Sequence, residues 1–304
     1  MWIRGMRQGL FTLPFTEDYA FQGNQGSQQM FDLQVTAYRA AIRPLDQLDD
    51  TRSPLAVRSA PLHRLPSSAT TPARPMMQYV MSYDPGNTVN SQRRRFFGSI
   101  AHGVKWIHLY EFQSWPTSGG DPGPEVWRNR PGMYAAVRSE THVYGMFDDI
   151  VASGANAPQG AKAAMLFSAT ADIYQEGYGT SGAAKRALFL AIKHAGIALD
   201  VVIEEDLTLK SSLAVTAQYS VIYITDRRIT TQAGAALATW VAAGGIVFSA
   251  VGGAMTNETD QPNLPVMHML GVESCEVHVS DDDIDYIVRA RPGRLSALSV
   301  FLCK

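Results

Sequence analysis

The sequence predicts an α/β protein whose C-terminal half holds a parallel sheet. Strand-like and helix-like segments alternate from residue 163 to residue 250. Several of these strand segments are apolar at successive positions, which is typical of strands covered on both faces. The last strand runs into Gly252 and Gly253 and then into a polar loop, as at the carboxyl edge of such a sheet. We therefore expect a doubly wound, flavodoxin-like sheet in this half.

The elements of that half follow from the same alternation. We expect strands at 163–168, 199–207, 220–225 and 245–250, and helices at 181–196 and 230–245. The sequence beyond Gly271 carries few signals, and we expect it to begin a further β region.

The N-terminal half has three parts. A strand at 9–15 ends in an acidic turn at 16–18, and a helix is expected at 27–42. We expect residues 44–75 to form an irregular loop, because prolines interrupt every possible helix; they are Pro44, Pro54, Pro61, Pro66, Pro72 and Pro75. Regular structure then returns, with strands at 76–81 and 105–112 and helices at 91–103 and 131–153. Proline and glycine at 154–160 predict a boundary between a domain at 1–155 and a second at 156–304.

Composition narrows the functional classes. The chain has 304 residues, 46% of them hydrophobic and 18% charged, with a formal net charge of -2. This balance indicates a globular protein without a nucleic-acid or membrane-surface partner. No apolar run reaches the ~20 residues of a membrane span, and the N-terminal segment does not resemble a signal peptide. Cys275 and Cys303 lack metal or disulfide spacing, so a cytoplasmic location is expected.

Acidic residues lie at the carboxyl ends of all three N-terminal strands. Glu17 and Asp18 follow the first strand, Asp84 follows the second, and Glu111 lies near the end of the third. In an α/β barrel these ends form one rim, where catalytic carboxylates come from several strands. The alternative is that these acids only cap the helices that follow.

The residues that follow Glu111 suit a sugar. Gln113, Trp115 and Trp127 share its loop segment, and aromatic rings can stack on the C–H face of a sugar while carboxylates act on the glycosidic oxygen. We therefore expect Glu111, Glu17 and Asp84 as catalytic candidates, and Asp18, Gln113, Trp115 and Trp127 as carbohydrate-binding candidates.

Other motifs predict neither a metal nor a cofactor. His102 and His108 have no third ligand at metal spacing, and the acidic run at 281–285 lacks the glycine and distal glutamate of a calcium loop. Gly252 and Gly253 lie outside any phosphate-binding motif, so a tight turn is expected. The three arginines at 93–95 are expected on a solvated helix face.

The segments AKAAMLFSATADIYQ, KRALFLAIKHAGIALDVVIEEDL, YSVIYITDRRIT and LATWVAAGGIVFSAVGGAMTNETDQPN together resemble the β-galactosidase trimerisation domain. That domain accompanies family 42 glycoside hydrolases and is similar in fold to class I glutamine amidotransferases. The resemblance covers about residues 160–272 and implies a homo-oligomer, a trimer in that family. The segment MMQYVMSYDPGNTVNSQRRRFFGSIAHGVKWIHLYEFQSW resembles the last two βα units of the family's TIM barrel.

The resemblance implies a retaining glycosidase with a glutamate nucleophile close to Ser82. Serine cannot form a glycosyl ester of the carboxylate kind, so that role is absent or has moved to Asp84 or Glu111. The first 155 residues hold about three βα units, whereas a whole barrel takes about 250 residues.

Two hypotheses remain, a β-galactosidase-like glycoside hydrolase of partial or divergent form, and a non-catalytic carbohydrate-binding or oligomerisation subunit. An amidotransferase-like activity is disfavoured because no nucleophile elbow is present.

Overall fold

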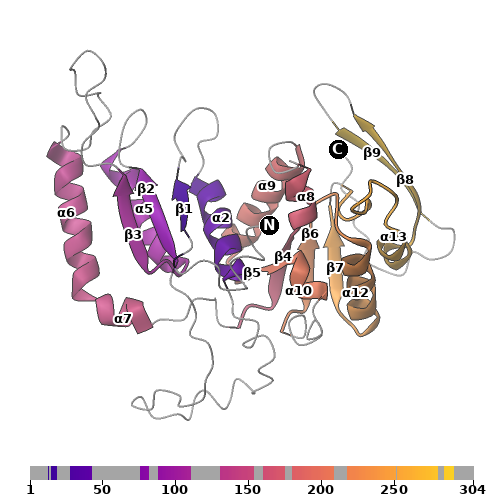
Figure 1. Cartoon of the computed structure of the whole chain (residues 1–304), viewed down its shortest axis with the longest axis horizontal. Helices are drawn as coiled ribbons and strands as arrows, with labels where there is room; N and C mark the ends of the chain where they lie inside the picture. Colours follow the sequence, from indigo (N-terminus) through magenta and orange to yellow (C-terminus); the bar gives the residue numbers. More distant parts are fainter. Residues whose placement is uncertain are drawn as a thin grey trace, which may run out of the picture. The chain divides into compact units, whose positions relative to one another are not determined.

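The computed structural model describes residues 13, 15–18, 28–42, 76–81, 88–110, 131–153, 160–174, 180–208, 218–250, 252–279 and 284–290 (Figure 1). The chain divides into two compact units; the described residues up to 153 belong to one and those from 160 onward to the other. Within the described ranges, every helix is too short or too polar to cross a membrane.

The N-terminal unit is built on a sheet of three parallel strands. These are β1 (Phe15–Asp18), β2 (Met77–Met81) and β3 (Trp106–Tyr110), in the spatial order β1-β2-β3. The register pairs Glu17 with Tyr79 and Tyr79 with His108. Helix α2 (Gln28–Ala41) follows β1, and α5 (Val89–Ala101) connects β2 to β3, as expected for βα units.

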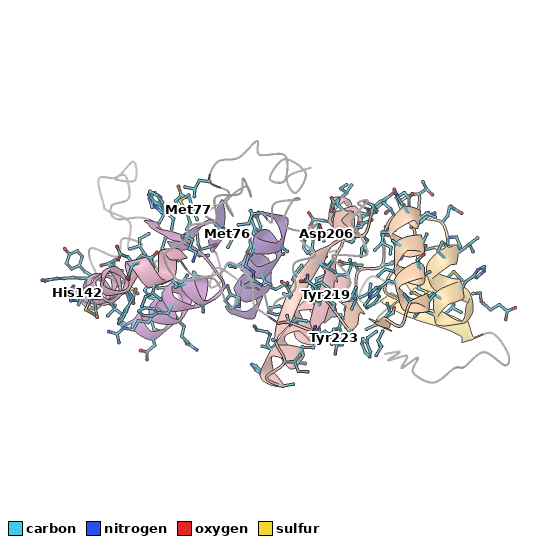
Figure 2. All side chains as sticks on the ribbon, turned by 90° about the horizontal axis from the view of Figure 1, so that it is seen from below. Met76, Met77, His142, Asp206, Tyr219 and Tyr223 are labelled. Carbon is cyan, nitrogen blue, oxygen red and sulfur yellow. The ribbon has the colours of Figure 1, made fainter. Side chains whose placement is uncertain are left out.

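One face of this sheet is covered by helices. Leu109 of β3 packs against Met133 and Val137 of α6 (Pro131–Met146), while Gln78 and Val80 of β2 are fully buried. Because side chains alternate along a strand, Met77 and Tyr79 belong to the other face and are only half-buried. Figure 2 labels Met77 beside Met76, which is buried just before the strand.

A capping box sets the first turn of α5. The main-chain N–H of Thr88 donates to the Ser91 hydroxyl at 2.9 Å, and the Ser91 N–H donates to the Thr88 hydroxyl at 3.1 Å. The helix ends at Ala101, and two residues later Gly103, with a φ of 93°, turns the chain toward β3. The main-chain N–H of Lys105 then donates to the Met76 carbonyl at 3.0 Å and aligns β3 with β2.

The C-terminal unit contains a sheet of four parallel strands. They are β4 (Ala163–Phe167), β5 (Leu199–Ile203), β6 (Val221–Ile224) and β7 (Ile246–Ser249), in the spatial order β5-β4-β6-β7. The order reverses at β4, because β5 lies on one side of it and β6 on the other. Connections of this kind between parallel strands require crossover helices.

Both faces of this sheet contribute to a core. Leu166, Val202 and Ile224 pack with Leu237 and Trp240 of α12 (Thr231–Ala242). On the other face Met165, Val201 and Ile203 are buried, as are Phe189 and Ile192 of α9 (Thr180–His194). Figure 2 labels two tyrosines here: Tyr219 lies just before β6, and Tyr223 lies within it. The Tyr219 hydroxyl donates a hydrogen bond to Asp200 at 2.8 Å.

The predicted turn at Gly252 and Gly253 is present, and the structure explains its second glycine. A Cβ atom on Gly253 would lie 2.6 Å from the Ile224 carbonyl oxygen, so the turn packs directly on the end of β6. Helix α13 (Leu264–Leu270) follows, and β8 (Val272–Val279) pairs with β9 (Ile284–Ala290) as an antiparallel hairpin. The sequence indicated a β region here but neither the hairpin nor α13.

Three expected elements have different bounds in the structure, and one helix was not predicted. Residues 16–18 belong to strand β1 rather than to a turn after it. The expected strand at 199–207 ends at Ile203, because α10 (Glu204–Thr208) begins there with three acidic residues that favour a helix N-terminus. The expected helix at 131–153 is interrupted at Phe147, between α6 and α7 (Asp148–Ser153). A short helix that was not predicted, α8 (Ala169–Ile173), follows β4.

A further correction concerns the arginines at 93–95. Arg93 is half exposed, as expected of a solvated face, but Arg95 is completely buried. The reason is helical geometry, since consecutive residues point in different directions and Arg95 lies on the buried face of α5 with Gln92 and Ser99.

Candidate functional site

The carboxyl ends of β1, β2 and β3 lie at the same edge of the N-terminal sheet, because all three strands are parallel. Asp18 ends β1 and is the register partner of Val80, and Met81 at the end of β2 is the partner of Tyr110 at the end of β3. Neighbouring strands lie about 4.8 Å apart. Ser82 and Glu111 are the next residues of the chain after the Met81 and Tyr110 pair.

The structure places part of the predicted site. Glu17 and Asp18 are the last two residues of β1, whose main-chain course is described. The other predicted site residues lie outside the described residues; they are Ser82, Asp84, Glu111, Gln113, Trp115 and Trp127. The spacing among the four candidate carboxylates therefore stays a prediction.

A second feature of this unit was not predicted, namely an aromatic surface on the face of the sheet opposite α6. The rings of Tyr79 and His108 stack with centroids 4.5 Å apart and an interplanar angle of 22°. Trp106 lies on the same face of β3 and is 60% exposed. Glu17 is in register with the Tyr79 and His108 pair. The sequence could not reveal this surface, because it depends on the register of β2 against β3.

On the helical side of the unit, α5 and α6 enclose a buried charge cluster. Glu140 of α6 is almost fully buried, and Gln92 donates to its carboxylate at 3.5 Å. Arg93 lies 3.9 Å from the same carboxylate, and the buried Arg95 donates to Gln92 at 3.5 Å. Burial raises the pKa of Glu140, and the Gln92 hydrogen bond and the charges of Arg93 and Arg95 offset this only in part.

The carboxyl edge of the C-terminal sheet holds a second polar network. Ser168 follows β4, Glu204 follows β5, and Asp226 lies just after β6. The Ser168 main-chain N–H donates to Asp226 at 2.8 Å, and its hydroxyl oxygen lies 2.7 Å from Glu204. All three residues are buried. The three strand ends are thus joined through one serine.

Lys185 of α9 completes this network. Its ammonium group pairs with Asp226 and lies 4.7 Å from the centroid of the Phe167 ring. Burial raises the pKa of Asp226, the neighbouring Glu204 adds to that effect, and the Lys185 charge opposes it.

The loop at 252–263 closes over the same edge. Arg228 donates to Asp260 at 2.6 Å, and its guanidinium group lies 4.4 Å from the centroid of the Tyr174 ring. The Thr231 N–H donates to the exposed Glu258 at 2.7 Å. Among the described residues, no group of three or more His, Cys, Asp or Glu side chains is placed to hold a metal ion.

Among the comparisons with known proteins, only the comparison of three-dimensional structures finds similar proteins. No family model matches the sequence, and no curated protein sequence matches it.

Three solved structures share the fold over nearly the whole chain. Gan42B, a GH42 β-galactosidase from G. stearothermophilus, superposes with a TM-score of 0.65 at 12% identity, over 95% of this chain and 43% of that one. The β-galactosidase from Bacillus circulans sp. alkalophilus gives a TM-score of 0.65 at 10% identity, again over 95% and 43%. The β-galactosidase from Rahnella sp. R3 gives 0.60 at 14% identity, over 96% and 44%. The chain thus has the fold of GH42 β-galactosidases and spans less than half the length of those it matches.

Proposed function

We propose that this chain is part of a β-galactosidase-like glycoside hydrolase that cleaves O-glycosidic bonds of a carbohydrate. The observation that carries the proposal is the fold shared with GH42 β-galactosidases over 95% of the chain. The parallel order β1-β2-β3 supports it, because the candidate acids lie at or after the ends of strands that meet at one edge.

In this proposal Glu111, Glu17 and Asp84 supply the catalytic carboxylates. Ser82 occupies the place where the family resemblance puts a glutamate nucleophile, so Asp84 or Glu111 takes that role. Asp18, Gln113, Trp115 and Trp127 bind the sugar through hydrogen bonds and ring stacking. Retention of configuration requires two of the carboxyl groups to lie about 5–5.5 Å apart.

The two parts of the chain have different roles in the proposal. Residues 1–155 form a partial TIM-barrel segment that carries the sugar site. Residues 156–304 form a flavodoxin-like, trimerisation-like domain, supported by the strand order β5-β4-β6-β7 and by buried residues on both faces of that sheet. We further propose a homo-oligomer, a trimer by resemblance, that acts in the cytoplasm.

The test is hydrolysis of an aryl β-galactoside by the purified protein and its variants. Replacing Glu111 with Gln should lower kcat by about 10²–10⁴-fold, since it removes a proton-transferring or nucleophilic group. Glu17→Gln and Asp84→Asn should behave alike if both act in catalysis. Glu273→Gln is the matched control, because Glu273 is an exposed carboxylate in the other unit. Activity unchanged by Glu111→Gln removes this residue from the catalytic role.

A second candidate function is a non-catalytic subunit that binds carbohydrate or partner chains. One observation favours it, namely the 60% exposure of Trp106. In that case the protein hydrolyses no aryl glycoside. Carbohydrate binding would appear as a change in tryptophan fluorescence on addition of galactose, and binding of partner chains as an oligomer mass in light scattering.

A further inference from the structure

A cradle of hydrogen-bond donors at the carboxyl edge of the C-terminal sheet holds the Glu204 carboxylate. The main-chain N–H of Thr230 donates to it at 2.5 Å and that of Thr170 at 3.2 Å. The Thr170 hydroxyl donates at 3.1 Å, and the Ser168 hydroxyl lies at 2.7 Å. The single Ser168 hydrogen can go to Glu204 or to the Arg228 carbonyl, which is 2.6 Å from the same oxygen.

The donors and the acceptor come from different segments of the chain. Ser168 is the N-cap of α8 and Thr170 lies in the first turn of that helix. Thr230 is the N-cap of α12, and Glu204 follows β5 as the first residue of α10. Ser168 is also held by its N–H bond to Asp226, and its hydroxyl accepts from Ala171 at 3.0 Å. The Thr230 hydroxyl likewise accepts from the Ala233 N–H and caps α12. These contacts hold the donors in place independently of the Glu204 side chain.

The position of the cradle is where open parallel sheets bind their ligands. The strand order reverses between β5 and β6 on the two sides of β4, and a crevice at such a point receives ligands in α/β proteins. Here a carboxylate of the chain itself occupies that point. Thr170 and Thr230 are only half-buried, so the cradle borders solvent.

We propose that this cradle is a carboxylate-binding site whose resident ligand is the Glu204 side chain. A free small carboxylate enters the same site when that side chain is shortened to alanine. The atoms removed by Glu204→Ala are the γ-methylene and the carboxyl group, which together have the size of acetate. The nearby Asp226 charge is paired with Lys185, so a second anion is tolerated there, as it is for Glu204. This proposal does not depend on the proposed glycosidase activity.

The test measures thermal unfolding of Glu204→Ala in the full chain at rising acetate concentration. Without acetate, the orphaned N–H donors should lower the unfolding midpoint by about 5 °C or more. Acetate should raise the midpoint in proportion to the logarithm of its concentration once the site is filled. Formate should act more weakly because it lacks the methyl group, and chloride at equal ionic strength should have no effect.

Glu258→Ala is the matched control. Glu258 also accepts from a main-chain N–H and a hydroxyl, both of Thr231, but it is exposed. Acetate should therefore not stabilise this variant. Equal acetate responses in the two variants would overturn the proposal, as would an unchanged midpoint in Glu204→Ala.

Glu204→Gln tests whether the carboxylate itself is needed or only the volume of the side chain. It also provides the test if the alanine variant does not fold. It fills the same space but directs an amide nitrogen at donors, so its midpoint should fall and acetate should not restore it. A glutamine variant as stable as the wild type would show that the carboxylate is not needed, and the proposal would fail.

Discussion

Two buried carboxyl groups, those of Glu140 and Asp226, make the stability of the folded protein depend on pH. Burial raises the pKa of each above its ordinary value of 4.5 and 3.8, respectively. A carboxyl group whose pKa is raised by folding contributes stability that is present below its unfolded pKa. That contribution is lost as the pH rises through the folded pKa. Both residues therefore act in the same direction, and their contribution to stability falls as the pH rises above their unfolded pKa values.

Glu140→Gln tests this sign. The substitution removes a titrating group, so the difference in unfolding midpoint between the variant and the wild type should shift in favour of glutamine as the pH rises from about 4.5 to 8. The physical reason is that the buried carboxylate no longer has to ionise beside α5. Thermal unfolding at four or five pH values measures it, with Glu273→Gln as the exposed control. A shift in the opposite direction would mean that Arg93 and Arg95 outweigh burial.

Gly253→Ala tests the turn after β7. The added Cβ would lie 2.6 Å from the Ile224 carbonyl oxygen and 3.1 Å from that of Ala250, so the turn must move away from β6. We expect a loss of about 1–3 kcal/mol in the free energy of unfolding. Gly145→Ala is the control, since no atom lies within 4 Å of its added Cβ in the exposed part of α6. That substitution should stabilise by about 0.5–1 kcal/mol.

The sequence predicted turn residues better than the surroundings of individual side chains. It indicated the Gly252 and Gly253 turn from residue type alone, because few other residues serve there. It missed the burial of Arg95, the Tyr79 and His108 stack, and the Glu204 cradle. Each of these depends on which helix or strand lies opposite, and one sequence does not contain that information.

At the scale of elements, the start of α5 is set by Thr88 and Ser91, immediately after the segment that contains Asp84. Thr88→Ala removes the hydroxyl that accepts from Ser91 and should cost about 1 kcal/mol in the free energy of unfolding. Thr88→Ser retains the cap and should cost much less. Chemical denaturation of the three proteins measures the difference. Equal stabilities of the alanine and serine variants would show that the cap contributes nothing.

Elements were predictable where hydrophobic pattern and turn residues agreed. Strands β4, β6 and β7 follow apolar runs bounded by glycine or polar residues, and α12 lies between two of them as expected. The prediction failed at 204–208, where a strand pattern continued into an acidic helix start, and at α8, which has only five residues. Short helices are held by their caps and contacts rather than by a periodic pattern.

For the whole molecule, the central proposal is that the carboxyl edge of β1, β2 and β3 carries the catalytic acids of a glycosidase. The parallel register supports it, since the ends of β2 and β3 are direct partners at Met81 and Tyr110. The sequence resemblance and the structural comparison agree on the GH42 fold, although identity to the matched structures is only 10–14%. The unit at 158–304 has its own core and its own edge network.

Covalent labelling by a 2-fluorinated activated galactoside, followed by peptide mapping, tests this claim most directly. A retaining glycosidase forms a glycosyl ester on its nucleophilic carboxylate. The account predicts one label, on Asp84 or Glu111, that is lost when the labelled residue is changed to its amide. A label on a carboxylate of the C-terminal unit, or a protein that hydrolyses aryl β-galactosides without any label on these residues, would contradict it.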